Sequence, residues 1–255
     1  MSRRGRRAAV VLAGGRGTRM GGLVRDVPKP LLPVAGRPLI TYQLERLAAA
    51  DVTDVVVATG YLADAFPAAL GDGSAYGVTL RLVVEDRPLG TGGGLRRALD
   101  AAGLGSGDTV VVVNGDLLSG HDLGSQLAAF EQDRSQRGAV ATLHVRRVDD
   151  ARPYGLVETG PDGRIHSFRE KPSTPCAGLI NAGTYVVDPS LLSEVDPGTV
   201  SSLERDVLPA AIARGAVLTA HRQDSDFLDV GTPEALQQAE SSPLVRARAG
   251  HDRGV

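Results

Sequence analysis

The sequence has a single cysteine, Cys176, among its 255 residues. One cysteine excludes an internal disulfide and agrees with a reducing compartment, so we expect a cytoplasmic protein. The chain also lacks any apolar run near the roughly 18 residues that a membrane-spanning helix needs. Because 42% of its residues are nevertheless hydrophobic, the composition predicts a soluble globular protein that does not associate with membranes.

A strong net charge is missing as well. The formal net charge is −2, which gives no general attraction for nucleic acid, so we expect no nucleic-acid partner. Residues 1–7 are locally basic, but the apolar run that follows them is too short for a signal peptide. We therefore expect residues 1–7 to form a solvated basic tail.

Lysine is scarce. It occurs only at positions 29 and 171, and all the other cationic side chains among the 28 lysines and arginines are arginine. Both lysines precede a proline, in the tripeptides 28–30 and 170–172. A flexible ammonium binds differently from a planar guanidinium, so Lys29 and Lys171 are candidates for a functional role. The alternative is chance use of lysine at two positions.

A glycine-rich turn follows the first predicted strand. Residues 8–13 are apolar, and the chain then breaks into glycines where a helix would otherwise begin. The glycines of this turn are Gly14, Gly15 and Gly17. Without a Cβ, their backbone N–H groups can approach an anion closely, and the cations of Arg19 and Lys29 add to the same place. The pattern predicts a loop that binds a polyphosphate.

Two other phosphate-binding motifs do not fit this turn. The dinucleotide pattern G-x-G-x-x-G and the P-loop ending in Gly-Lys-Ser/Thr are both absent, which disfavours a dehydrogenase and a P-loop enzyme. A glycine-rich turn on its own is also compatible with a tight structural connection. The neighbouring motifs therefore decide between these two interpretations.

Strands and helices alternate through the first half of the chain. We expect strands at 54–59, 78–84 and 109–113, and helices at 39–50, 63–70 and 95–102. A second glycine loop at 88–94 is expected to open the last of these helices. This alternation predicts parallel βαβ units. Ligands of such sheets bind outside the carboxyl ends of the strands, where Gly14, Glu85 and Asp116 fall.

The second half has a different pattern. Segments 154–159, 165–169 and 180–187 are strand-like, and residues 161–163 predict a hairpin turn. Helices are expected at 201–213 and after residue 233. Residues 241–255 are polar and rich in arginine, so we expect a frayed tail there.

Several motifs together resemble one enzyme family. They are the segment 12–19, the tripeptides 28–30 and 170–172, the segment 88–93 and the segment 227–233. Over roughly residues 8–239 the chain resembles the sugar-1-phosphate nucleotidylyltransferases, and most of all the guanylyltransferases of manno-heptose 1-phosphate and mannose 1-phosphate. The resemblance implies a Rossmann-like, GT-A-like α/β fold with a mixed, mostly parallel central sheet, flanking helices and a small β-rich acceptor region.

The resemblance also implies a domain division and a reaction. Residues 8–240 would form one domain, with a nucleotide-binding half at 8–120 and a sugar-phosphate-binding half at 121–240. The reaction would be the attack of a sugar 1-phosphate on the α-phosphorus of a nucleoside triphosphate, which releases pyrophosphate. Such a displacement requires positioning and positive charge around the phosphates. The two substrates are then the expected partners, and a homo-oligomer is compatible with the sequence.

Catalytic and metal-binding roles follow from the same resemblance. Arg19 would stabilise the leaving phosphates, Lys29 the transferring phosphate, and Lys171 the sugar phosphate. Asp116 and Asp229 match the two aspartates with which the family binds Mg²⁺, an ion that prefers carboxylate and water ligands. A turn residue at Asp116 and a helix-start residue at Asp229 are the structural alternatives, although Thr232 suits the helix start better.

Substrate-binding roles complete the assignment. The nucleotide-binding residues implied are Leu12, Ala13, Gly14, Gly15, Gly17, Thr18, Glu85, Gly90 and Thr91. The sugar-phosphate-binding residues implied are Gly155, Glu170, Lys171 and Asn181. Glu85 lies where thymidylyl and uridylyl relatives often carry glutamine. Its carboxylate suits the N1–H and N2–H₂ donors of guanine, so we expect GTP as the donor, the alternative being a solvated acidic residue after a strand.

Other functions stay open. A mannose or glucose 1-phosphate with another nucleoside triphosphate is the nearest alternative to manno-heptose 1-phosphate. A molybdopterin-type nucleotidyltransferase shares the opening motif, but that family has an Asp-Lys pair that is absent here. A non-catalytic subunit that binds nucleotide sugars belongs to a different functional class. The charged residues expected for catalysis are all retained in this chain, which favours an enzyme.

Overall fold

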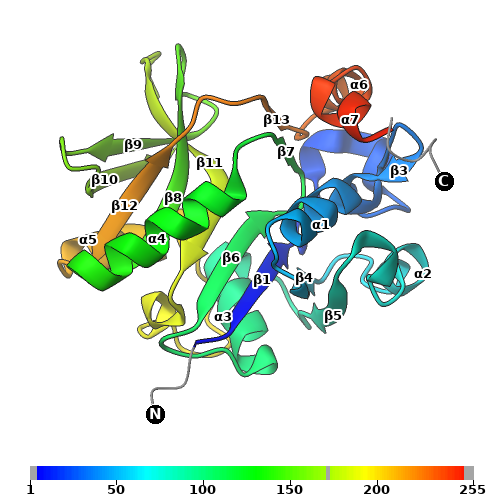
Figure 1. The fold of residues 1–255 in the computed structure, drawn as a ribbon. Helices are drawn as coiled ribbons and strands as arrows, with labels where there is room; N and C mark the ends of the chain where they lie inside the picture. Colours follow the sequence, from blue (N-terminus) through cyan, green and yellow to red (C-terminus); the bar gives the residue numbers. More distant parts are fainter. Residues whose placement is uncertain (1–4, 171–172, 250–255) are drawn as a thin grey trace.

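A mixed sheet of nine strands forms the centre of the computed structural model, which describes residues 5–170 and 173–249 (Figure 1). The strands are β1 (Arg7–Leu12), β4 (Asp54–Thr59), β5 (Thr79–Val84), β6 (Thr109–Asn114), β8 (Ala139–Val148), β9 (Gly155–Thr159), β10 (Ile165–Glu170), β11 (Gly178–Val187) and β12 (Val217–Arg222). The order across the sheet is β10-β9-β11-β6-β1-β4-β5, with β8 beside β11 and β12 beside β8. Helices cover both faces, so the predicted α/β class with a mixed, mostly parallel central sheet is confirmed.

The first half of the chain builds the parallel part of this sheet. Strands β6, β1, β4 and β5 are neighbours and run parallel. The helices that connect this part are α1 (Leu39–Ala49), α2 (Ala65–Leu70) and α3 (Gly90–Ala102). The predicted βαβ units are therefore present. Helix α3 begins at Gly90 and not at residue 95, so the expected second glycine loop is for the most part the first turns of a helix.

The second half adds strands of both directions. Strand β11 runs antiparallel to β6, β8 and β9, whereas β12 runs parallel to β8. The predicted turn at 161–163 joins the antiparallel strands β9 and β10. Helix α4 (Leu123–Arg137) was not expected, although Asp122 caps its start and Gly138, in the left-handed conformation, ends it. Both are ordinary helix boundary signals that the sequence carries.

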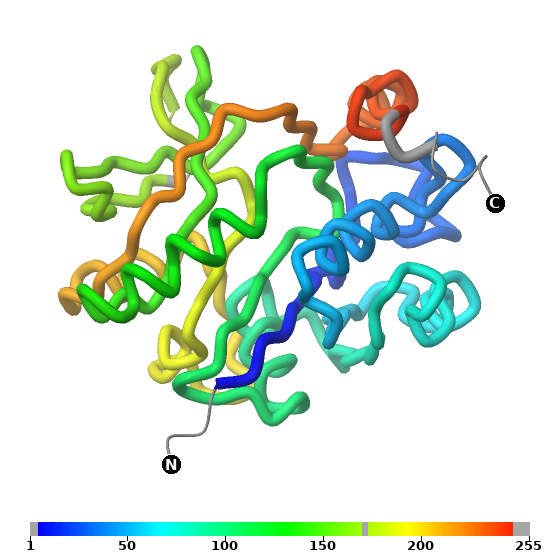
Figure 2. Tube along the Cα trace, viewed as in Figure 1, coloured from blue at the N-terminus to red at the C-terminus, as the bar shows by residue number. Residues whose placement is uncertain are grey.

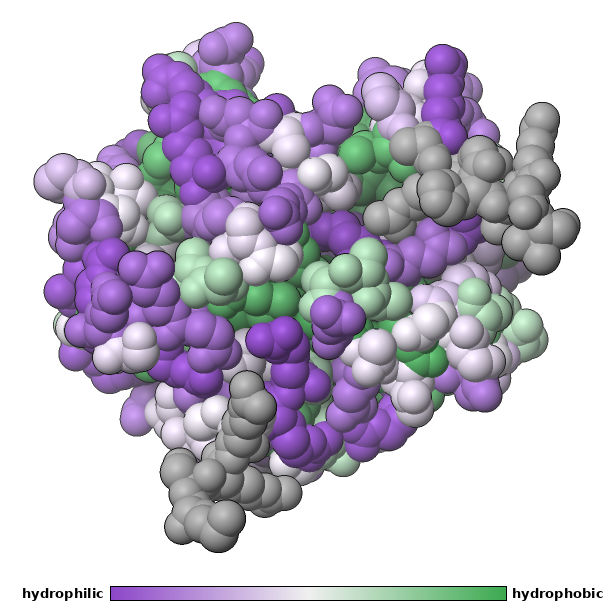
Figure 3. All heavy atoms as spheres, in the orientation of Figure 1, coloured by the Kyte–Doolittle hydropathy of each residue, from purple (hydrophilic) through white to green (hydrophobic). Residues whose placement is uncertain are grey.

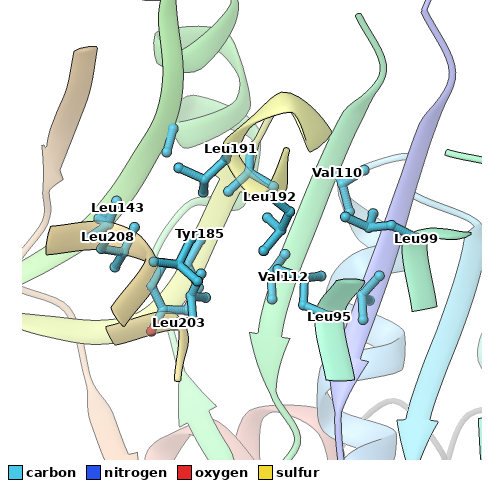
Figure 4. Packing of buried hydrophobic residues seen from close by; sticks show 14 of the residues in the cluster. Leu95, Leu99, Val110, Val112, Leu143, Tyr185, Leu191, Leu192, Leu203 and Leu208 are labelled. Carbon is cyan, nitrogen blue, oxygen red and sulfur yellow. The ribbon is translucent and has the colours of Figure 1, made fainter. Parts of the chain in front are cut away.

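The sheet is buried on both faces because successive residues of its central strands are apolar and point alternately to one face and the other. In β1, Ala8 and Val10 pack into one cluster with α3, whereas Ala9 and Val11 pack into the other with α1, α2 and α4. Figure 4 shows Leu95 and Leu99 of α3 beside Val110 and Val112 of β6, with residues of β8 and β11 continuing the cluster. A strand buried on both faces reads as a continuous apolar run, which is how β1 and β6 appear in the sequence. Figure 3 shows hydrophilic residues over most of the visible face.

Short elements at the carboxyl ends of the parallel strands complete the fold. They are β2 (Pro33–Val34), β3 (Arg37–Pro38), β7 (Leu117–Ser119), β13 (Phe227–Asp229), α6 (Pro233–Glu240) and α7 (Pro243–Ala249). Helix α5 (Leu208–Ala213) follows a π-helical turn, Leu203–Val207, and contacts β10. Figure 2 shows the C-terminal helices beside the segment near residue 35, although the two are far apart in sequence. The frayed tail that we expected at 241–255 is wrong for residues 243–249, which form α7, while residues 250–255 lie outside the described part of the chain. Helix α7 packs through Val245, which is 1% exposed, because that residue joins Val34 and Leu39 in an apolar cluster.

Candidate active site

Three adjoining pockets open at the carboxyl ends of β1, β5 and β6, and Asp116 lines all of them. The glycine-loop pocket, of about 250 Å³, is lined by Leu12, Ala13, Gly15, Gly17, Thr18, Arg19, Lys29, Pro30, Asp116 and Gly231. The Glu85 pocket, of about 360 Å³, is lined by Leu12, Gly14, Gly15, Arg16, Ala58, Glu85, Pro88, Gly90, Thr91, Asn114 and Asp116. The Tyr154 pocket, of about 170 Å³, is lined by Arg19, Asn114, Asp116, Leu117, Pro153, Tyr154, Gly155, Asn181, Gly183, Glu204, Phe227 and Asp229.

All nine predicted nucleotide-binding residues line the first two pockets. The glycine turn that we expected after β1 leaves open space, since a Cβ added at Gly15 would meet no atom within 4 Å. Gly17 has a φ of 61°, a left-handed conformation that glycine adopts without strain. The turn therefore exposes its backbone to a ligand.

The two predicted cations of this region lie on the same pocket but in different surroundings. Lys29 is only 6% exposed, and its Nζ lies 2.5 Å from Oδ2 of Asp116. Arg19 is exposed, and its guanidinium lies against the backbone of Gly231, where an added Cβ would approach a guanidinium nitrogen to 2.9 Å. A buried ammonium paired with a carboxylate and an accessible guanidinium thus flank the glycine turn.

Glu85 is held at the wall of its pocket. Its Oε2 accepts the N–H of Leu89 at 2.9 Å, and its Oε1 lies where side chains on Gly14 and Gly94 would otherwise stand. Burial raises the pKa of the Glu85 carboxyl, whereas the Leu89 hydrogen bond and the charge of Arg97 lower it by less. The glycines on either side thus make room for one partly buried carboxylate.

A short antiparallel pair, β7 with β13, brings Asp116 and Asp229 to one pocket. Asp229 pairs with Leu117, the neighbour of Asp116, and the N–H of Val230 donates to the carbonyl of Asp116 at 3.0 Å. Thr232 caps the next helix by accepting the N–H of Ala235, so Asp229 is not the helix-start residue. Tyr154 lines the same pocket as Asp229, and burial together with the charge of Asp229 raises the pKa of the Tyr154 phenol.

These two carboxylates suit a divalent cation. Within residues 5–170 and 173–249, no group of three or more metal-binding side chains occurs. Mg²⁺ does not require one, since it keeps several waters and binds one or two protein carboxylates together with substrate phosphates. The donor set at Asp116 and Asp229 therefore fits that ion.

A buried polar cluster adjoins the end of β7. Ser119 of β7 and Nδ1 of His121 are 2.9 Å apart, and the His121 ring stacks on His144 at 3.7 Å. Nε2 of His121 lies 2.8 Å from Oε1 of the fully buried Gln126. Burial lowers the pKa of His144 to about 4 and that of His121 still further, so both rings are neutral at physiological pH.

The predicted sugar-side residues are brought together only in part. Gly155 and Asn181 line the Tyr154 pocket. The backbone of Glu170 pairs with that of Gly155 across β9 and β10. Lys171 lies outside the described residues, so its predicted role stays a prediction.

Several pocket-lining residues were not among the predicted site residues. Arg16, Asn114 and Glu204 are polar members of this group. Arg16 lies inside the glycine turn, and Asn114 directly precedes the predicted Gly115-Asp116 turn, so neighbouring motifs could have indicated both. Glu204 is more than 80 residues away from either motif, but it lies in the segment 202–209, whose sequence resembles a segment near the sugar site of related guanylyltransferases.

The chain is similar to known proteins over most of its length. Residues 8–244 match the family model described as Nucleotidyl transferase. A mannose-1-phosphate guanylyltransferase of Mycobacterium tuberculosis is 43% identical over 242 residues, which are 94% of this chain. The matched region spans 65% of that relative's length. Within the part that the structure describes, no helix is long and apolar enough to cross a membrane.

Two solved structures share the fold. A Bacillus anthracis protein described as a glucose-1-phosphate thymidylyltransferase, in complex with sucrose, has a TM-score of 0.80 and 26% identity, and the match covers 92% of this chain and 94% of that one. HddC of Yersinia pseudotuberculosis, complexed with GMP-PN, has a TM-score of 0.74 and 27% identity, and the match covers 92% and 98%. The sequence match and these structural likenesses agree, and the chain belongs to the nucleotidyl transferase family.

Proposed function

We propose that this protein transfers a guanylyl group from GTP to a sugar 1-phosphate, with mannose 1-phosphate as the leading acceptor, and releases pyrophosphate. One observation carries the proposal: the glycine-loop pocket and the Tyr154 pocket meet at Asp116, with Arg19 lining both and Lys29 paired to Asp116. Two anionic substrates can therefore meet at a point where this chain supplies cations.

The reaction forms a bond between a phosphate oxygen of the sugar 1-phosphate and the α-phosphorus of GTP. The bond from that phosphorus to the oxygen bridging to the β-phosphate breaks, and its electrons leave with pyrophosphate. Attacking and leaving groups are both anionic, so their repulsion must be reduced. Arg19 and Lys29 supply charge at the leaving and transferring phosphates, and the glycine turn supplies backbone donors.

Asp116 and Asp229 would hold the metal ion. Members of the family are generally metal-dependent, and we propose Mg²⁺ as the ion here. When bound, the ion neutralises phosphate charge and orients the phosphate oxygens. Lys29, paired with Asp116, lines the same pocket and would supply positive charge to a phosphate bound there.

Glu85 supports guanine as the base. A carboxylate accepts hydrogen bonds and donates none, which suits the N1–H and N2–H₂ of guanine and opposes the carbonyls of uracil and thymine. The name of the 43% identical relative supports the same base and favours mannose as the sugar. Manno-heptose 1-phosphate, which the motifs favoured, is the second candidate acceptor. The single cysteine favours a reducing, cytoplasmic location.

The test is pyrophosphate release with Mg²⁺ across GTP, ATP, UTP, CTP and dTTP. Each nucleotide is paired with mannose, glucose and manno-heptose 1-phosphates. We expect release that requires both substrates and is fastest with GTP and mannose 1-phosphate. If no combination releases pyrophosphate and calorimetry shows tight binding of a nucleotide sugar, the result would contradict the proposal and favour a non-catalytic subunit that binds nucleotide sugars.

Substitution of the metal-binding carboxylates tests the site itself. We expect Asp116→Asn and Asp229→Asn each to lower kcat at least about 100-fold, because each removes a charge that holds the ion. Asp226→Asn is the matched control, since Asp226 precedes β13 but lines none of the three pockets. Turnover near the wild-type value in either of the first two variants contradicts the metal assignment.

A further inference from the structure

Glu204 connects the Glu85 pocket with the Tyr154 pocket. The residue lines the Tyr154 pocket, and its Oε2 accepts the hydroxyl of Thr91, which lines the Glu85 pocket, at 2.7 Å. Its Oε1 accepts the hydroxyl of Tyr185 at 2.9 Å. One carboxylate therefore contacts a group from each half of the proposed active site.

The donors and acceptors of this network have only one consistent arrangement. A carboxylate only accepts hydrogen bonds, so Thr91 and Tyr185 must both donate their hydroxyl protons to Glu204. The Tyr185 oxygen then accepts the amide N–H of Asn181 at 2.6 Å, and Asn181 Oδ1 accepts the N–H of Gly183 at 3.1 Å. The amide of Asn181 cannot be flipped without breaking both bonds.

Fixed hydrogen-bond directions determine what each pocket offers a ligand. The Thr91 oxygen also accepts the N–H of Leu203 at 2.8 Å, which leaves one lone pair and no free proton. Thr91 thus presents an acceptor in the Glu85 pocket. Asn181 keeps its second amide hydrogen and presents a donor in the Tyr154 pocket.

The backbone around Glu204 is held in place from several directions. Ser201 donates its N–H to the carbonyl of Leu89 at 2.8 Å and accepts the N–H of Gly92 at 2.8 Å, which joins this segment to the start of α3. Ser202 caps the π-helical turn by accepting the N–H of Arg205, and donates its hydroxyl to Glu204 at 3.0 Å. Turns of this type are frequent at functional sites.

We propose that Glu204 is a positioning residue shared by both substrates. It orients Thr91 to accept a hydrogen from the nucleotide and Asn181 to donate a hydrogen to a hydroxyl oxygen of the sugar phosphate. The inference rests on the proposed function. It predicts that one substitution, far in sequence from both glycine-rich segments, weakens the binding of two chemically different ligands.

Glu204→Gln is the informative substitution. An amide keeps one acceptor oxygen but turns an NH₂ donor toward the other hydroxyl. One hydroxyl therefore loses its acceptor, and the other is no longer held in a single hydrogen-bond direction by the shared network. We expect the KM for GTP and the KM for the sugar phosphate each to rise about tenfold, as for the loss of a buried hydrogen bond, with kcat reduced less than about threefold.

Partial variants separate the two arms of the network. Thr91→Val is expected to raise only the nucleotide KM, and Thr91→Ser to restore it, because serine keeps the hydroxyl. Tyr185→Phe is expected to raise only the sugar-phosphate KM. Asp206→Asn is the matched control on the same turn, since Asp206 accepts the N–H of Ser202 at 2.7 Å but lines none of the three pockets.

The measurements combine steady-state kinetics with calorimetric binding of GTP alone and of mannose 1-phosphate alone, and a melting temperature for each variant. A rise in both KM values for Glu204→Gln with a melting temperature near wild type supports the inference. A rise in only one KM, or a lower melting temperature with both KM values unchanged, overturns it. If the wild type binds both ligands without releasing pyrophosphate, the proposed function is wrong but the inference about Glu204 still stands. In that case the inference is tested by calorimetry, and equal ligand affinities of the wild type and Glu204→Gln overturn it.

Discussion

Two glycine-rich segments of this protein look alike in sequence and serve opposite purposes. In the turn after β1, Gly15 has no atom within 4 Å of the place where a Cβ would stand. At the start of α3, a Cβ on Gly93 would lie 2.2 Å from the carbonyl oxygen of Thr199. The first segment uses glycine to leave an open pocket. The second uses glycine so that another segment of the chain can pack against the helix.

The difference has a structural consequence for the active site. The segment packed on α3, residues 199–203, leads directly into the turn that carries Glu204. A glycine-rich helix start thus allows a segment of the second half of the chain to pack against a helix of the first half. Substitution of single glycines by alanine distinguishes the two roles, because a glycine needed for packing affects stability and a glycine that lines the pocket affects substrate binding.

The largest effect on stability is expected for Gly93→Ala. Overlap with a backbone oxygen costs about 3 kcal/mol or more, and the better helix propensity of alanine returns only about 1 kcal/mol. We therefore expect a net loss of about 2 kcal/mol in the free energy of unfolding, measured by urea denaturation. Gly105→Ala is the control, because no atom lies within 4 Å of its added Cβ. Equal stability of the two variants would show that the helix start is not tightly packed.

Gly15→Ala is expected to do the reverse. Its added methyl meets no protein atom, so the free energy of unfolding should change by less than about 0.5 kcal/mol. The same methyl enters the pocket where we propose the phosphates bind, and we expect the KM for GTP to rise about tenfold, the equivalent of one weakened contact. An unchanged KM would remove the glycine turn from the binding site.

Gly94→Ala falls between these two cases. Its Cβ would lie 2.5 Å from Oε1 of Glu85, the end of a flexible side chain that can move at a cost of about 1 kcal/mol. We expect a small loss of stability and a clear loss of preference for GTP over UTP, because the displaced carboxylate no longer faces the base. The ratio of kcat/KM values for the two nucleotides measures this, and an unaltered ratio means that Glu85 does not contact the base.

The smallest effect concerns the pH dependence of Glu85. The pKa of Glu85 is raised in the folded protein, so the folded state holds its proton more tightly than the unfolded state does. The wild type therefore loses stability as the pH rises from below the unfolded pKa to above the folded pKa. We expect Glu85→Gln to gain stability relative to wild type as pH rises from 4 to 8. Melting curves across this range test the sign. A constant difference between the two proteins would show that burial does not penalise this carboxylate.

Local patterns in the sequence were sufficient for the parallel half of the fold. The apolar runs of β1 and β6 and the helical spacing in α1 were each predicted near their observed positions. The same patterns placed Gly14, Glu85 and Asp116 at one edge of the sheet, because the carboxyl ends of parallel strands meet there, whereas the full set of nucleotide-binding residues came from the family resemblance. The start of α3 was misplaced, since glycine normally disfavours a helix and the packing that requires it lies about 100 residues further along.

What the sequence by itself determined is therefore the local chemistry: which segments are buried strands, where glycines break them, and which charges follow each break. The tertiary structure decided which distant segments share a pocket. Pairing of β13 with β7 places Asp229 beside Asp116, and the turn at Leu203–Val207 places Glu204 against Thr91. Helix α7 is ordered for the same reason, because Val245 is buried only when Val34 and Leu39 lie next to it. Such contacts join residues more than 100 positions apart, and no local pattern of hydrophobicity or turn residues encodes them.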